Sequence, residues 1–275
     1  MSDKKYPLDI TVACSLGLEG GLARYRDELS GFSKDDFDLV HEWNRALKKT
    51  MKQPEFRACI DTSTRFLLNL PATQVSKIID KISVPYRSYY YAKRFIDAAN
   101  FVYDRAGVCA NIVDFGRGLS PWGHVVRKNL PYVEMYSIDK HEANMAFQST
   151  SEKMNLPVPI FIDDLPDNTL FDQDIVVSLG TFVYLDDIEQ KANLVRCSRK
   201  FKNLFIELEK PNADQADKTL IHNMGTSYNR GLSKDSILSA VGNKIPFKLQ
   251  NLDSHVKNAR LAQALKNSTE MFLVR

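Results

Sequence analysis

The chain has 275 residues, of which 44% are hydrophobic and 26% charged, with a formal net charge of +3. This composition is typical of a globular protein with a sizeable core, and the charge is too small to require nucleic acid or an anionic membrane as partner. The four cysteines are scattered without a CxxC pair, which argues against a zinc site or a disulfide framework, so we expect no metal. Without a long apolar leader or a run of roughly 18 apolar residues, we expect a cytoplasmic protein and no membrane association.

The part of the chain before residue 107 has apolar residues mostly at helical spacing. Segment 35–51 carries an apolar stripe, and Ser33 with Asp36 forms a helix-start signal. Segments 63–82 and 89–107 continue the helical pattern. In segment 13–25 the glycines interrupt any regular pattern, which predicts a loose connector. We therefore expect a helical N-terminal domain over residues 1–106.

From residue 107 onward, short apolar runs alternate with helical stretches. This alternation predicts a doubly wound α/β domain over residues 107–275, with a mainly parallel sheet covered on both faces. Two last runs are expected to pair as antiparallel edge strands. The expected strands are 110–115, 133–139, 158–163, 174–180, 203–209, 246–252 and 270–275.

The first predicted strand ends in the turn Asp114-Phe115-Gly116-Arg117-Gly118. Ligands of such sheets bind beyond the carboxyl ends of the strands, and the glycines permit a backbone approach that a Cβ would forbid. Ser120 and Pro121 then predict a helix start, with Ser120 as N-cap, whose free amides suit an anionic or polar group.

Three further strand ends carry candidate contacts for a ligand that contains adenosine. The second strand ends at Asp139, 21 residues beyond Gly118, where a carboxylate can accept both hydroxyl protons of a ribose. The third ends in Asp163-Asp164-Leu165, an acid pair with an apolar neighbour that suits an adenine amine. The fourth ends in the small-residue turn 178–180, which would face the reacting centre.

A nicotinamide cofactor is disfavoured, because Pro121 stands where the dinucleotide fingerprint needs a third glycine. The segment from about Asn111 to the C-terminus, with "VDFGRG", "SID", "FIDDL" and "DIVVSLGTFVYLDD", resembles the class I S-adenosylmethionine-dependent methyltransferases. The resemblance implies a Rossmann-like seven-stranded sheet with an antiparallel last strand, and S-adenosylmethionine as cofactor.

The resemblance also implies roles for the residues at the strand ends. Asp114, Gly116 and Gly118 would line the methionine part of the cofactor, and Arg117 would either point away from the methyl group or bind the cofactor carboxylate. Asp139 would bind the ribose. Asp163 or Asp164, with Leu165, would contact the adenine. The methyl-transfer region would consist of Ser178, Leu179 and Gly180.

Catalytic and substrate residues are less defined by the sequence. His222 and Tyr228, after the fifth strand, are candidates for a general base, whereas Glu207 and Glu209 at the end of that strand are not assigned. The tentative substrate contacts are Tyr89, Tyr91, Arg94, Tyr184 and Arg230.

Three functions stay open at this point. The favoured one is methylation of a small molecule, with the N-terminal helices as a lid that includes Tyr89, Tyr90, Tyr91 and Phe95. The second is RNA methylation, because residues 44–110 contain 12 Lys/Arg against 5 Asp/Glu with interleaved aromatics. The order of domains and "GLSP" are also similar to the aminoglycoside-resistance 16S rRNA methyltransferases, whose turn reads Gly-Leu-Asn-Pro. The third is a non-catalytic protein that binds S-adenosylmethionine.

Overall fold

The computed structural model describes residues 8–82, 86–106, 110–165, 174–185, 187–209, 234–242, 248–250 and 270–274. Helices fill the described chain before the sheet, as the apolar spacing predicts. Their bounds are α1 (Asp9–Arg24), α2 (Lys34–Thr50), α3 (Pro54–Arg57), α4 (Thr62–Leu67), α5 (Ala72–Ile82) and α6 (Arg87–Arg105). The predicted start of α2 is confirmed, because Ser33 and Asp36 form a reciprocal capping box.

Within the described ranges, seven strands form one sheet in the order β3-β2-β1-β4-β5-β7-β6. The strands β1 to β5 pair in parallel, and β7 is antiparallel to both β5 and β6. The predicted doubly wound, mainly parallel seven-stranded sheet with an antiparallel last strand is therefore confirmed. The strand bounds are β1 (Asn111–Phe115), β2 (Glu134–Ile138), β3 (Ile160–Phe161), β4 (Ile175–Ser178), β5 (Asn203–Glu209), β6 (Lys248–Gln250) and β7 (Glu270–Val274).

Strand β3 is shorter than the predicted run 158–163. Pro159 stands directly before it and has no N–H to donate, so the ladder with β2 begins only at Ile160.

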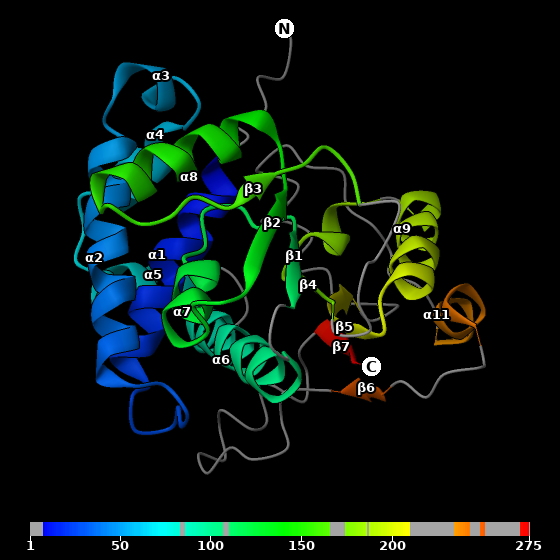
Figure 1. The fold of residues 1–275 in the computed structure, drawn as a ribbon. Helices are drawn as coiled ribbons and strands as arrows, with labels where there is room; N and C mark the ends of the chain where they lie inside the picture. The colour runs from blue at the N-terminus through cyan, green and yellow to red at the C-terminus, as the bar shows by residue number, and fades with distance from the viewer. Residues whose placement is uncertain are drawn as a thin grey trace, which may run out of the picture.

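Helices cover both faces of the sheet (Figure 1). The N-terminal helices gather on one side together with α7 (Trp122–Asn129) and α8 (His141–Lys153). Helices α9 (Asp187–Lys200) and α11 (Lys234–Val241) lie on the other. Within the described residues, no helix is long and apolar enough to cross a bilayer.

The N-terminal helices share a hydrophobic core with the sheet. Leu18 of α1 and Phe95 of α6 belong to the same buried cluster as Ile112 of β1, Val177 of β4 and Phe205 of β5. The division into domains 1–106 and 107–275 stays a prediction. The shared core shows that the N-terminal helices pack directly against one face of the sheet.

The prediction of a loose connector over residues 13–25 is wrong, because this segment lies almost wholly inside α1. Gly17, Gly20 and Gly21 fall at i, i+3 and i+4, on one face of the helix. A Cβ on Gly20 would lie 2.5 Å from the Ala72 carbonyl of α5, and one on Gly21 would lie 1.9 Å from the Ser88 carbonyl of α6. The glycines therefore let α1 approach two neighbouring helices closely.

Replacement of Gly21 by alanine tests this packing. Alanine favours an exposed helix over glycine by about 1 kcal/mol, whereas forcing a methyl group against the Ser88 carbonyl costs about 1–3 kcal/mol. We therefore expect Gly21→Ala to lower the free energy of unfolding, measured by urea denaturation. Gly123→Ala in α7 is the matched control, because its Cβ would meet only the mobile end of Met135 at 3.1 Å. Equal effects of the two substitutions would contradict close packing of α1.

Candidate functional site

The glycine turn after β1 has a backbone that other residues would strain. Gly116 has φ of +74° and Gly118 has φ of +60°. The N–H of Gly116 donates to the Ile138 carbonyl at 2.7 Å, and Thr181, after β4, donates to the carbonyls of Phe115 and Gly116 at 3.2 and 2.9 Å. A Cβ on Gly116 would lie 1.7 Å from Thr181 Oγ1. The turn thus joins the ends of three strands, and Thr181 is a site residue that sequence reasoning missed.

Asp139 lies at the end of β2 and is bonded to the same turn. Its carboxylate accepts a hydrogen bond from the Gly118 N–H and another from the Lys140 N–H at 2.7 Å. The side chain is only partly buried, and a carboxylate has about four acceptor positions. Asp139 can therefore keep these bonds and still accept from a diol.

The helix after the turn begins one residue later than predicted. Helix α7 starts at Trp122, with Pro121 and not Ser120 at the N-cap position. The Ser120 hydroxyl accepts only a long bond, 3.4 Å, from the Trp122 N–H. The first i to i+4 bond of the helix runs from the Val125 N–H to the Pro121 carbonyl, at 3.2 Å, which leaves Ser120 outside the helix.

The N-terminal helices contact the glycine turn, through residues of α1 and α2 that the sequence analysis did not single out. The indole N–H of Trp43 in α2 donates to the Leu119 carbonyl at 2.9 Å. A Cβ on Gly118 would lie 2.9 Å from the methyl group of Thr11 in α1. The site is therefore built from both parts of the chain.

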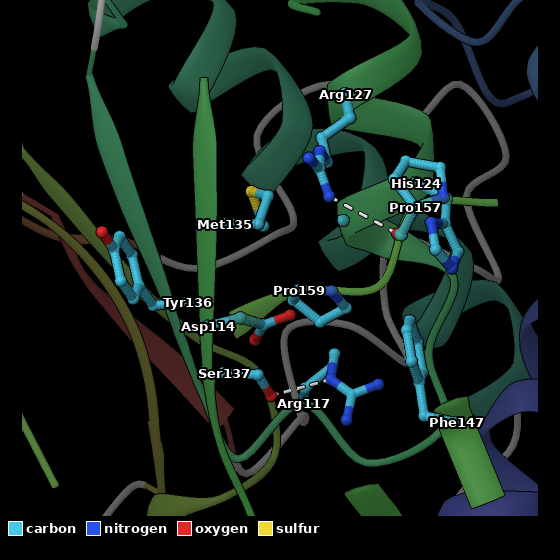
Figure 2. Close-up of a pocket in the computed structure, with 11 residues that line it drawn as sticks. Asp114, Arg117, His124, Arg127, Met135, Tyr136, Ser137, Phe147, Pro157 and Pro159 are labelled. Atoms are coloured by element: carbon cyan, nitrogen blue, oxygen red, sulfur yellow. Dashed lines mark hydrogen bonds between the residues drawn. The ribbon is translucent and has the colours of Figure 1, made fainter. Parts of the chain in front are cut away.

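Arg117 points into a small hollow behind β2 (Figure 2). Its Nε donates to the Ser137 hydroxyl at 2.8 Å and its Nη2 donates to Asn144 at 3.0 Å. The guanidinium carbon lies 3.4 Å from the centre of the Phe147 ring, while Nη1 is buried without a partner among the described residues. Burial lowers the pKa of Arg117 to about 10, against the opposing effect of Asp114 and Asp139. The guanidinium therefore links the glycine turn to β2 and α8.

Asp114, on β1, faces the same hollow. The residue is buried, with 4% of its surface exposed. Burial raises its pKa from the ordinary 3.8 to about 7; nearby Arg117 opposes this and the charge of Asp139 adds to it. A neighbouring cation, such as a bound ammonium group, would favour the ionised form.

The expected adenine contacts lie after β3. Both carboxylates are exposed, but Asp164 is paired with Arg196 of α9 and accepts from the Leu165 N–H at 2.8 Å. The Leu165 side chain is buried in the core with Val113. The Asp163 side chain makes no hydrogen bond within the described ranges, so it is the acid that stays available.

The end of β4 lies beside the ion pair between Arg94 of α6 and Glu207 of β5. Ser178 is fully buried and Leu179 packs on the core, whereas Gly180 has φ of +78°. A Cβ on Gly180 would lie 3.1 Å from Nη1 of Arg94. This nitrogen donates to both carboxylate oxygens of Glu207, at 2.9 and 2.6 Å, and the Tyr90 hydroxyl donates to the same carboxylate at 2.7 Å.

Of the tentative substrate contacts, the structure brings Tyr91, Arg94 and Tyr184 together. The Arg94 guanidinium carbon is 4.8 Å from the centre of the Tyr91 ring. Burial, followed by the nearby Cys14 and Tyr91, raises the pKa of Tyr184 well above 10, so this phenol stays protonated. Tyr89 lies apart, in the core against Tyr25. His222, Tyr228 and Arg230 lie outside the described residues.

A metal site is not apparent: across the residues that the structure describes, no group of three or more His, Cys, Asp or Glu side chains could hold a metal ion. His124, beside Arg117, bonds Ser151 at 3.0 Å, and burial lowers its pKa to about 3. It is a neutral packing residue.

Comparison with known proteins gives neighbours only among solved structures, since no family model and no curated protein matches the sequence. Geranyl diphosphate C-methyltransferase from Streptomyces coelicolor A3(2) is 10% identical, over 88% of this chain and 96% of that one, with a TM-score of 0.46. The plantazolicin methyltransferase BpumL is 13% identical, over 86% of this chain and 98% of that one, with a TM-score of 0.44. The mitomycin 7-O-methyltransferase MmcR is 12% identical, over 92% and 66%, with a TM-score of 0.42. These similarities concern the fold alone, so the chemistry of the site rests on its own residues.

The raised pKa of Asp114 predicts how stability depends on pH. Because the folded protein holds this proton more tightly than the unfolded chain, the stabilisation is complete below about pH 4 and is lost as the pH rises to about 7. We expect the free energy of unfolding of the wild type, relative to Asp114→Asn, to fall across this range by on the order of 4 kcal/mol at most.

Urea denaturation at a series of pH values measures this difference, with the exposed Asp35→Asn as the control. If the difference in the free energy of unfolding between wild type and Asp114→Asn is constant or rises with pH, burial does not disfavour the ionised form of Asp114.

Proposed function

We propose that this protein binds S-adenosylmethionine at the glycine turn and transfers its methyl group to a small-molecule acceptor. The observation that carries the proposal is the meeting of the glycine turn, Asp139 and the Gly180 turn at one edge of the sheet. The strand order changes direction between β1 and β4, and ligands of doubly wound sheets bind at such a switch point. Thr181 joins the two turns there.

The residues present fit this cofactor. Asp139 would bind the ribose hydroxyls, and Asp163 would bind the adenine amine. The carbonyls of Phe115 and Gly116, on the side of Thr181, would bind the ammonium group. The carboxyl group of Asp114, which faces the hollow beside Arg117, would attract it through its charge and not by direct contact. These acids also suit a cofactor with a positive sulfonium. A dinucleotide fits less well, because Pro121 replaces the third glycine of its fingerprint.

The bound cofactor supplies an electrophilic methyl group with a good leaving group. The contribution of the chain is then to hold the acceptor close to and in line with that methyl group, which is worth up to about 7–11 kcal/mol where the orientation is ideal. The Gly180 turn with Tyr91, Arg94 and Tyr184 would form the acceptor side. His222 and Tyr228 remain candidates for a general base where the acceptor must lose a proton.

A small acceptor is favoured over RNA by the position of the aromatic residues of α6. Tyr89, Tyr90 and Phe95 are at most 2% exposed, and a base can stack only on an accessible ring. The same burial in the core means that these three rings do not form the expected lid. Helices α1 and α2 also contact the glycine turn, which supports an enclosed site beneath them. An enclosed acceptor site suits a compact substrate.

Calorimetric titration with S-adenosylhomocysteine, the demethylated product, tests the cofactor assignment. We expect micromolar binding by the wild type and a loss of at least about tenfold in Asp139→Asn, because a neutral amide oxygen replaces a charged acceptor of the ribose hydroxyls. Asp35→Asn removes an exposed carboxylate of α2 and should bind as the wild type does.

Transfer of a labelled methyl group to candidate acceptors then separates an enzyme from a protein that only binds the cofactor. Absence of binding by the wild type, or equal binding by Asp139→Asn, would contradict the assignment. Binding of NAD in preference would indicate a different adenosine ligand.

A further inference from the structure

Arg94 presents an unused edge at the carboxyl ends of β4 and β5. Among the residues that the structure describes, Nη1 alone is bonded, to Glu207. Its Nε and Nη2 make no hydrogen bond to any residue in the described part of the chain. The side chain as a whole is 10% exposed, so Arg94 lies at the border of the core. A guanidinium in such surroundings ordinarily has partners for its N–H groups, which makes the unused edge a candidate for a ligand contact.

The remainder of the guanidinium is held in one orientation. Glu207 is 1% exposed and is itself bonded by Tyr90. The rings of Tyr90 and Tyr91 lie 5.6 and 4.8 Å from the guanidinium carbon. Burial lowers the pKa of Arg94, but Glu207 outweighs it and the net shift is upward, so the group stays charged. Glu207 and Tyr90 are therefore positioning residues for a fixed cation.

The cation lies beside the turn that follows β4. Nη1 and Nη2 approach the Cβ position of Gly180 to 3.1 and 3.5 Å. The next residue, Thr181, is bonded to the glycine turn. A second guanidinium, that of Arg87, lies 5.3 Å from the Tyr91 ring and adds positive potential. A side chain larger than that of Gly180 would crowd this position.

We propose that the Nε–Nη2 edge of Arg94 binds a carboxylate group beside the point of methyl transfer. The planar edge of a guanidinium offers two parallel N–H donors, which match the two oxygens of a carboxylate. This inference rests on the proposed function and adds to it the chemistry of a ligand group. The carboxylate belongs either to the amino-acid end of the cofactor or to the acceptor, and the two sources are separated by experiment.

The first arm compares calorimetric binding of S-adenosylhomocysteine and of 5′-methylthioadenosine, which lacks the amino-acid group. Arg94→Lys keeps the charge and loses the fork. The double variant Arg94→Met/Glu207→Gln removes both charges, so no buried carboxylate is left unpaired. If the cofactor supplies the carboxylate, both variants bind S-adenosylhomocysteine about ten- to hundredfold more weakly and 5′-methylthioadenosine unchanged.

The second arm uses protein saturated with S-adenosylhomocysteine and the matched probes benzoate and benzamide. If the acceptor supplies the carboxylate, the wild type binds benzoate in preference to benzamide, and the Arg94 variants lose that preference. Arg105→Met is the matched control, because Arg105 also stacks on a ring of α6 but lies at the exposed far end of the helix.

The inference is overturned if the Arg94 variants bind S-adenosylhomocysteine as tightly as the wild type and the saturated wild type does not prefer benzoate. That result leaves the proposed function standing. A wild type that binds neither S-adenosylhomocysteine nor 5′-methylthioadenosine instead refutes the proposed function together with the inference. Thermal unfolding of each variant, compared with the wild type, verifies that a loss of binding is not a loss of folding.

Discussion

The site depends on the hydrogen bonds that join the ends of β1, β2 and β4. Gly116 donates to Ile138 at the end of β2, Asp139 accepts from Gly118, and Thr181 donates to the carbonyls of Phe115 and Gly116. These bonds require glycine at 116, because a Cβ would overlap Thr181. One turn thereby fixes where Asp139 and the turn after β4 lie relative to each other.

The N-terminal helices contact the same glycine turn. Their contacts, from Thr11 and Trp43, lie on two helices, and α1 reaches its place because its glycines allow close approach to α5 and α6. Arg94 of α6 then meets Glu207 of β5. Without α6, the turn at Gly180 would have no charged pair beside it.

Local patterns in the sequence predicted most of the fold, because strand alternation, helical spacing and the capping box of α2 are short-range properties. The same reasoning located the acids that end β1, β2 and β3. It predicted a connector at the glycines of α1, because glycine is common both in loops and where two helices pack closely. Only the i, i+3, i+4 spacing distinguished them.

Long-range pairs escaped prediction for a physical reason. Arg94 and Glu207 are 113 residues apart, and only the packing of α6 on the sheet brings them together. Thr181 became a site residue through its contact with a turn 65 residues away. Arg117 stands between the two glycines of the turn in the sequence, yet its side chain bonds to Ser137 and Asn144, which are 20 and 27 residues away.

The most direct test of the central claim is a crystal structure of the protein grown with S-adenosylhomocysteine. The account predicts the ligand between the glycine turn and the Gly180 turn, with its ribose hydroxyls bonded to Asp139. A ligand bound elsewhere, or a saturated crystal without ligand at this edge of the sheet, would contradict it.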